Sequence, residues 1–177
     1  MLYKSSEIEK DSIMRTAARM CVAARTAPKG CGTDNLVTAI LTDSDKDDLA
    51  DEMEKIGKKK KIDFFVRDAQ CVRQSTAVVL IGTKLSTRGV PYCGFCGFKD
   101  CSGKIEHGGV CVYDSADLGI AIGSAASIAA DDRVDNRVLF SAGKTAINLN
   151  LLGEEVQIVF ALPLAAKGKN VFFDRNC

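Results

Sequence analysis

The chain has 177 residues and a formal net charge of +1, from 24 lysines and arginines against 23 acidic residues. This balance argues against a nucleic-acid-binding domain, which normally carries a basic excess. With 46% apolar and 27% charged residues, the composition is that of a globular protein and excludes wholesale disorder. The length suits one domain over residues 1–177, which is enough to bury a core without covalent cross-links.

The first third of the chain predicts a helix, a strand and a second helix. Residues 6–27 carry apolar side chains at helical spacing, with Ser6 as the cap. Leu36–Leu41 is a candidate strand. The next helix starts at Ser44 or Asp45, where acidic residues favour a first turn, and runs to about Ile56.

The middle of the chain continues with a basic run, a short helix and a strand. We expect Lys58–Lys61 to be a solvated loop, because no aromatic residues interleave it as they would in a nucleic-acid contact. Residues 64–73 are predicted to be a short helix. Thr76–Gly82 is apolar throughout and predicts a strand at the centre of a sheet.

Residues 86–112, called the cysteine segment below, are rich in glycine, lack periodicity and predict a loop-like insert. They are followed by a predicted helix over residues 116–130, capped by Ser115. It is apolar on nearly every side, which predicts a buried core helix, and it is too short to span a membrane. Gly119 and Gly123 suggest close packing against another helix.

The last third predicts a helix over residues 142–151 and a strand over 156–162 that Pro163 ends. Strands with helices packed around them indicate a mixed α and β layer fold. Neither a G-x-G-x-x-G after a strand nor a Walker pattern occurs, so a classical nucleotide-binding fold is unsupported.

Eight cysteines stand out against one histidine and no tryptophan. Because the start of the chain is polar and lacks the apolar core of a secretory signal, we expect a cytoplasmic protein. In a reducing compartment these cysteines indicate metal ligands or reactive thiols rather than disulfides. Cys93, Cys96, Cys101 and Cys111 gather in the order C-x2-C-x4-C-x9-C.

This spacing favours an iron–sulfur cluster over zinc. Structural zinc sites usually combine two separated C-x2–4-C knuckles, whereas only one C-x2-C exists here, although His107 could replace one cysteine as a zinc ligand. A [4Fe–4S] cluster takes four thiolates. Gly94 and Gly97 would let the backbone turn around it, and we expect Phe95 and Phe98 to shield it from water. A segment without metal stays open as an alternative.

The remaining candidates support simpler interpretations. We expect His107 to be a solvated loop residue, and Cys21 and Cys71 to be small buried side chains. Cys31 lies in a glycine-rich loop near Lys29, where a redox or ligand role stays open. The last residue, Cys177, is expected to fray. Because the single histidine lies in the cysteine segment, a Cys–His–Asp catalytic site is unsupported and no catalytic residue is assigned.

Four stretches of the chain carry a resemblance to one family. The run from Cys93 to Cys101, CGFCGFKDC, looks like an iron–sulfur element of bacterial redox proteins. Together with residues 23–30, 117–125 and 168–175 it resembles a prokaryotic family described as ferredoxin-domain-containing proteins. This resemblance covers almost the whole chain and implies a [4Fe–4S] domain, but no particular reaction.

A more distant resemblance is to flavin-dependent nitroreductases. It is carried by the stretch Ala27–Gly30, which follows the first helix, and by the alanine-rich helix over residues 116–130. It implies an α+β fold, with a mixed sheet flanked by helices, a homodimer and an FMN site in which Arg25, Lys29 and Gly30 would hold the flavin phosphate. The chain departs from this pattern, because the arginine-rich N-terminal element is missing and Lys29 replaces a serine. The simpler interpretation of the same residues is a helix C-terminus: Gly30 ends the helix, and the charges of Arg25 and Lys29 complement the helix dipole.

These observations predict an iron–sulfur electron-transfer protein, with a partner protein, a small-molecule acceptor or a bound flavin receiving the electrons. A structural-zinc binding module and an FMN-dependent reductase of small molecules are the alternatives. We expect neither nucleic-acid nor membrane binding.

Overall fold

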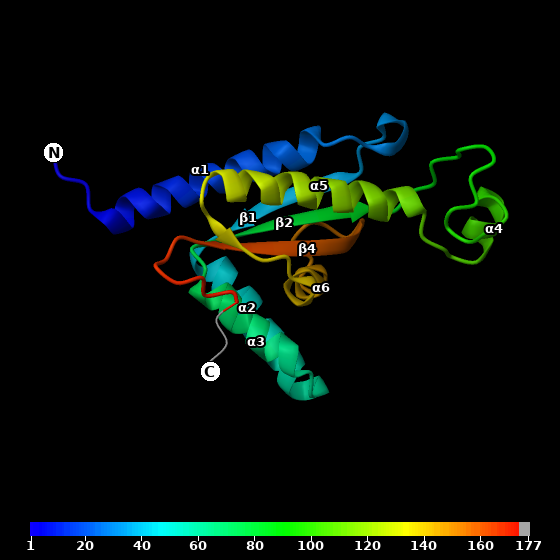
Figure 1. The fold of residues 1–177 in the computed structure, drawn as a ribbon. Coiled ribbons are helices and arrows are strands. Elements are labelled where there is room, and N and C mark those ends of the chain that lie inside the picture. The colour runs from blue at the N-terminus through cyan, green and yellow to red at the C-terminus, as the bar shows by residue number, and fades with distance from the viewer. Residues whose placement is uncertain (174–177) are drawn as a thin grey trace.

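The computed structural model describes residues 1–173 (Figure 1). Its elements follow one another along the chain as α1 (Ser5–Thr26), η1 (Gly30–Gly32), β1 (Leu36–Leu41), α2 (Asp43–Lys60), α3 (Asp63–Gln74), β2 (Ala77–Lys84), α4 (Cys101–Glu106), α5 (Val112–Asp131), β3 (Asp135–Asn136), α6 (Phe140–Asn148) and β4 (Val156–Ala165).

The four strands form one antiparallel sheet in the order β1-β2-β4-β3. Strand β2 lies at its centre, and every residue from Ala77 to Thr83 is buried. Side chains of a strand point alternately to the two faces of the sheet. In β2 the odd-numbered residues from Ala77 to Ile81 enter one core, and Val78 and Leu80 enter the other. The sheet is therefore buried on both faces.

Helices cover both faces of the sheet (Figure 1). Helices α1 and α5 pack side by side on one face, where Ile13, Met20, Leu118 and Ala125 join the core. Helices α2, α3 and α6 cover the other face, with Leu49, Met53, Val72 and Ala142 buried against it. The α+β class, with a sheet flanked by helices, is confirmed, but the sheet is antiparallel at every pairing and not mixed as expected.

Most predicted elements are confirmed, and the differences have physical causes. The predicted caps Ser6 and Ser115 lie inside α1 and α5, which begin one and three residues before them. The Lys58–Lys61 run is not a loop: its first three residues form the last turn of α2, where cations complement the negative end of the helix dipole.

The prediction that Pro163 ends the last strand is wrong. Pro163 lies within β4, opposite Val78. The amide of Ala161 donates to the Leu139 carbonyl at 3.1 Å, on the side of the strand away from β2. The backbone nitrogens of residues 161 and 163 point to the same side, because alternate residues of a strand have the same orientation. On this side β4 pairs only with the two-residue strand β3 and with the isolated bridge at Leu139, so a proline is tolerated there. The missing N–H therefore costs no bond to the central strand.

The prediction that α5 is buried nearly all round is wrong. Leu118, Ala121 and Ala125 face the core, but Ile120 on the opposite side is 46% exposed. A β-carbon added to Gly119 or Gly123 would meet no other atom within 4 Å, so these glycines do not mediate close packing within the chain. Within residues 1–173, no helix combines the length and the apolar character needed to cross a membrane.

The two ends of the long axis of the molecule stand apart from the layered body (Figure 1). At one end the first two turns of α1 project with all of residues 1–12 exposed. At the other end lies the cysteine segment, residues 86–112, which links β2 to α5 and contains α4, a helix that was not predicted. Lys104 and Cys111 are the only residues of this segment that are buried as a whole, and the side chain of Arg88 is buried as well.

Candidate functional site

The four clustered cysteines line one pocket of about 310 Å³ in the cysteine segment. Each of them carries a free thiol; Cys111 is buried, and Cys93, Cys96 and Cys101 are partly buried. Cys101 is the first residue of α4, which Asp100 caps by accepting a hydrogen bond from the Gly103 amide at 2.9 Å. Cys111 precedes the first residue of α5. Two helix starts thus fix two of the four thiols.

Glycines shape the turn that carries the other two thiols. Gly94 and Gly97 adopt φ values of 63° and 84°, a left-handed region that other residues rarely enter. The Gly97 amide donates to the Gly94 carbonyl at 3.0 Å and closes the turn around Cys96. The structure therefore has the turns that the sequence predicts at these two glycines.

The four thiols at this pocket are the donor set that a metal–sulfur cluster requires. In residues 1–173, no group of three or more His, Cys, Asp or Glu side chains could hold a single ion. Four thiols spread around one pocket are the ligand set of a [4Fe–4S] cluster, in which each cysteine binds a different iron. If bound, the cluster would be held by Cys93, Cys96, Cys101 and Cys111.

Two cations with buried side chains, Arg88 and Lys104, line this pocket, and Arg88 pairs with two buried carboxylates of α5 that do not line it. Arg88 Nη1 donates to Asp114 Oδ1 and Arg88 Nη2 to Asp117 Oδ2, both at 2.9 Å. Burial would lower the pKa of the Arg88 guanidinium, but its hydrogen bond to Asp117 and the charges of Asp114, Asp117 and Cys111 raise it overall. Lys104 is 7% exposed, and its Nζ donates to the Ser86 carbonyl at 3.3 Å.

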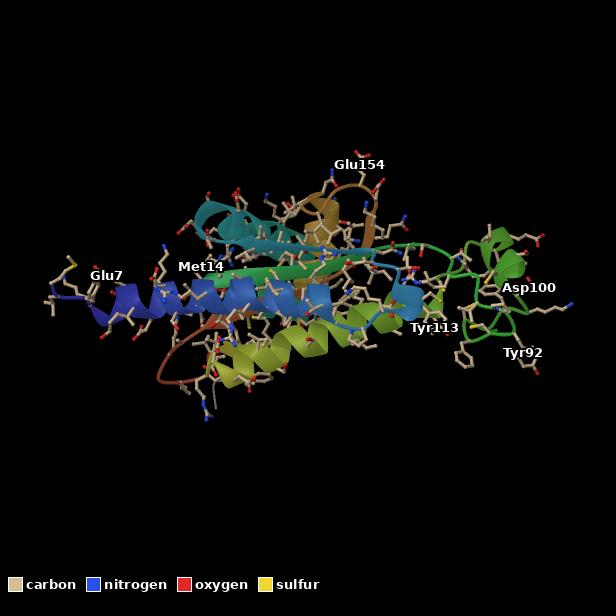
Figure 2. All side chains as sticks on the ribbon, turned by 90° about the horizontal axis from the view of Figure 1, so that it is seen from above. Glu7, Met14, Tyr92, Asp100, Tyr113 and Glu154 are labelled. Carbon is tan, nitrogen blue, oxygen red and sulfur yellow. The ribbon has the colours of Figure 1, made fainter. Side chains whose placement is uncertain are left out.

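Tyr113 connects this pocket to the body of the protein, and Figure 2 shows it between the helices and the cysteine segment. The pKa of its hydroxyl is raised, first by the negative charge of Cys93, then by burial and by Cys31; a hydrogen bond to Cys93 adds to the effect. Its ring packs so closely on Gly30 that a β-carbon there would lie 2.6 Å from the Tyr113 Cδ1. The exposed thiol of Cys31 therefore lies near the pocket, although it does not line it.

The aromatic side chains and the histidine of the segment lie outside the pocket. Phe95 is 77% exposed and Phe98 packs on Gly109 and on the His107 ring, whose centroid is 5.8 Å away. Neither phenylalanine lines the pocket, so the expected shielding by these two residues is wrong. His107 is exposed, and its Nδ1 lies 2.8 Å from the Gly103 carbonyl. It is not among the pocket residues.

The three residues considered for a flavin phosphate all contact protein groups. Arg25 pairs with Asp34 at 2.6 Å, and Lys29 Nζ donates to the carbonyls of Arg25 and Ala27 at the end of α1. The Gly30 amide donates to Asp117 Oδ1 at 2.9 Å. These contacts are those of a helix end whose carbonyls are capped by a cation. A flavin phosphate at these residues stays a prediction.

The other thiols are spread over the body. Cys21 is partly buried on α1, where burial raises the pKa of its thiol and a hydrogen bond with Thr38 opposes the shift. Cys71 is buried on α3, as expected. Cys177 lies outside the described residues.

Sequence reasoning missed the polar wall of the pocket. Arg88 and Lys104 have no distinctive motif, and their pairing with α5 depends on the fold. One signal was present: Asp114 and Asp117 lie three positions apart, on one face of a helix that is otherwise uncharged up to Asp131. Buried carboxylates on such a face require a cation.

The fold is that of the nitroreductases. The chain superposes on the FMN-dependent nitroreductase NfnB from Mycobacterium smegmatis, solved in complex with NADPH, with a TM-score of 0.62 and 9% identity; this covers 90% of this chain and 81% of that one. It also matches a nitroreductase with bound FMN from Bacteroides fragilis, with a TM-score of 0.60 and 12% identity over 92% of this chain and 82% of that one. At these identities the likeness concerns the fold.

The chain belongs to the family described as uncharacterized proteins containing a ferredoxin domain. The family model matches residues 107–175, a range that includes Cys111 but not the other three clustered cysteines. An uncharacterized protein from Archaeoglobus fulgidus is 33% identical over 99% of this chain and 98% of its own length.

Proposed function

We propose that this protein is an iron–sulfur redox protein that carries a [4Fe–4S] cluster on Cys93, Cys96, Cys101 and Cys111. The cysteine segment itself supports this most directly, because four free thiols line one pocket in a segment that buries few side chains. A segment without a hydrophobic core needs another source of folding energy, and metal–thiolate bonds supply it. The ferredoxin-domain description of the family agrees with this proposal.

A bound cluster of this kind would accept and release single electrons. The chain's own part is to position and protect the site. The thiols fix its place at one end of the sheet, close to the surface, where a partner protein or a small-molecule acceptor can approach. Arg88 and Lys104 place positive charge beside the negative thiolates, and Tyr113 closes the side toward the body.

Structural zinc is the alternative occupant of the same cysteines. The spacing has only one C-x2-C pair, and no group in residues 1–173 could hold a single ion. Both observations favour the cluster. The zinc alternative requires a colourless protein that loses structure with a chelator and takes part in no electron transfer.

An FMN-dependent reductase of small molecules is the second candidate function, and the nitroreductase fold favours it. In that version the flavin would receive electrons from the cluster, and the protein would supply position and electrostatics. Arg25, Lys29 and Gly30 remain the candidate phosphate contacts. Since Arg25 and Lys29 already bind carboxylate or carbonyl groups, they would have to exchange these partners for the phosphate.

The exposed side of α5 supports a homodimer. Ile120 and the bare backbone at Gly119 and Gly123 lie on this side, and Val22 on the neighbouring α1 is 63% exposed. An apolar face with small residues lets a second copy approach closely. Ile120→Glu should therefore shift the dimer toward monomer in light scattering; a wild-type monomer would contradict the proposal.

Replacement of the cysteine ligands tests the proposed function. Serine variants of Cys93, Cys96, Cys101 and Cys111, prepared without oxygen, should each lose most of the iron and sulfide that the wild type holds. Cys21→Ser is the matched control, because Cys21 lies on α1 outside the pocket, and it should retain both. Equal iron content in the four variants and the control would contradict the assignment.

A further inference from the structure

One buried arginine joins the cysteine segment to the body. Arg88 comes from the loop that follows β2, and its side chain is only 2% exposed. The side chains of Asp114 and Asp117, both from the first turns of α5, are 0% and 6% exposed and hold the two outer nitrogens of the guanidinium at 2.9 Å. Asp114 also accepts a hydrogen bond from the Ser86 amide at 2.8 Å. The guanidinium is therefore fixed in place.

The third nitrogen of this guanidinium is unused. Arg88 Nε is buried and has no hydrogen-bond partner in residues 1–173. Buried donors without a partner are rare, because nothing replaces the water that they lose. Arg88 lines the pocket together with the four cysteines, and its charge is near enough to Cys111 for the two to interact. The Nε–H is thus the one donor of the guanidinium that the protein leaves unpaired, in a residue that lines the pocket.

The charges around the pocket show what such a donor would do. Arg88 and Lys104 line the pocket, and the negative charges of Asp114 and Asp117, which pair with Arg88, balance these two positive charges before thiolates form. A cluster with four thiolates adds negative charge, and reduction adds one more. A fixed donor beside the sulfurs stabilises the reduced state more than the oxidised state, because the interaction grows with the negative charge.

We propose that Arg88 donates a hydrogen bond from Nε to a sulfur of the cluster or of its cysteine ligands, and thereby raises the reduction potential of the cluster. This inference rests on the proposed iron–sulfur function. Arg88 is a positioning and tuning residue in this account, since it acts on the electron carrier and not on a substrate. Asp114 and Asp117 orient it, and the same two carboxylates tie the segment to α5.

Redox titration of the reconstituted full chain tests whether Arg88 raises the reduction potential of the cluster. Arg88→Lys keeps the charge but removes the Nε donor. At a fixed applied potential, we expect the ratio of reduced to oxidised cluster to fall about tenfold, which is about 59 mV for one electron. Arg73→Lys is the matched control, because Arg73 also pairs with two carboxylates, has a buried nitrogen without a partner and lies outside the pocket. Its potential should equal that of the wild type.

A second measurement needs no variant. In wild-type protein labelled with ¹⁵N-arginine, the reduced cluster should show a nitrogen coupling in pulsed electron paramagnetic resonance. Absence of this coupling, or an unchanged potential in an Arg88→Lys protein that holds its full iron, would overturn the role of Arg88 alone. A wild type that takes up no iron during anaerobic reconstitution would instead overturn the proposed function, and the role of Arg88 with it.

Discussion

The layered body and the cysteine segment are held together in different ways. In the body, a central strand buried along its length separates two apolar cores, each covered by helices (Figure 1). In residues 86–112 only Lys104 and Cys111 are buried as whole residues, together with the side chain of Arg88, and most aromatic and aliphatic residues are exposed. Tyr92 and Phe95, for example, are 109% and 77% exposed.

The body has the buried apolar surface to fold by hydrophobic burial, whereas the cysteine segment needs a bound ligand. The body buries enough apolar surface to be stable by itself. The segment depends on glycine turns, one short helix and the ionic contacts of Arg88 with α5. A group bound by the four thiols would complete it. The candidate site thus lies in a part of the chain with few buried apolar side chains, and this is common for ligand-binding loops.

The largest effect should follow from a change in the body. Gly143 on α6 faces β4 so closely that a β-carbon there would lie 2.0 Å from the Val159 carbonyl oxygen. Because backbone cannot move aside easily, Gly143→Ala should lower the free energy of unfolding by about 3 kcal/mol or more in urea titrations. Gly168→Ala, in the loop after β4, is the control: since an added β-carbon there would meet no atom within 4 Å, the variant should raise stability by about 0.4–1 kcal/mol. Equal stability of the Gly143 variant and the wild type would contradict the close packing.

Removal of metal should affect the segment and spare the body. With a strong iron chelator under anaerobic conditions, the amides of residues 86–110 should exchange hydrogen much faster, because their fold depends on the metal–thiolate bonds. Those of β2 and β4 should remain protected. Hydrogen exchange followed by mass spectrometry gives both answers in one experiment. A segment with the same protection before and after chelation would fold without a bound group.

Acid should weaken the contact between α1 and the end of α5. The hydrogen bond from Thr16 Oγ1 to Asp132, at 2.8 Å, and the Arg19 ion pair lower the pKa of Asp132 despite partial burial. Because the pKa is lower in the folded state, the stabilisation is complete above the unfolded value of about 3.9 and is lost as the pH falls through the folded value. Asp132→Asn should thus destabilise the protein at pH 7 and differ little from the wild type at the acid end of a pH series.

The neighbouring Asp131→Asn is the control for this series, since Asp131 is exposed. Its unfolding free energy should stay close to that of the wild type throughout. A constant difference between Asp132→Asn and the wild type at every pH would contradict the electrostatic cause.

The smallest effect is expected at the projecting end of α1. The ion pair of Arg15 with Asp11, at 3.1 Å, has both side chains more than 70% exposed. Exposed pairs of this kind contribute little, so Arg15→Ala should change the free energy of unfolding by at most about 0.5 kcal/mol. A loss of several times this value, measured by urea unfolding, would show that this end of α1 is packed against another molecule.

The sequence predicts the body well because burial leaves a periodic pattern. Leu36–Leu41 has the predicted bounds of its strand, and the helix over 64–73 lies within α3. Pro163 misled the prediction because the irregular pairing beside it is a property of the sheet. The four cysteines could be found by spacing alone. The pairing of Arg88 with Asp114 and Asp117 could not, since it joins positions 26 and 29 residues apart through the turn of the segment.

The metal and cofactor content of the full chain, prepared and kept without oxygen, tests the central claim most directly. Iron, acid-labile sulfide, zinc and released flavin should be measured on one sample together with its visible absorption. We predict a brown protein with about four irons and four sulfides per chain, as a [4Fe–4S] cluster requires. Released FMN in the same sample would add the reductase function. A colourless protein with one zinc and no iron would contradict the account and leave a structural binding module.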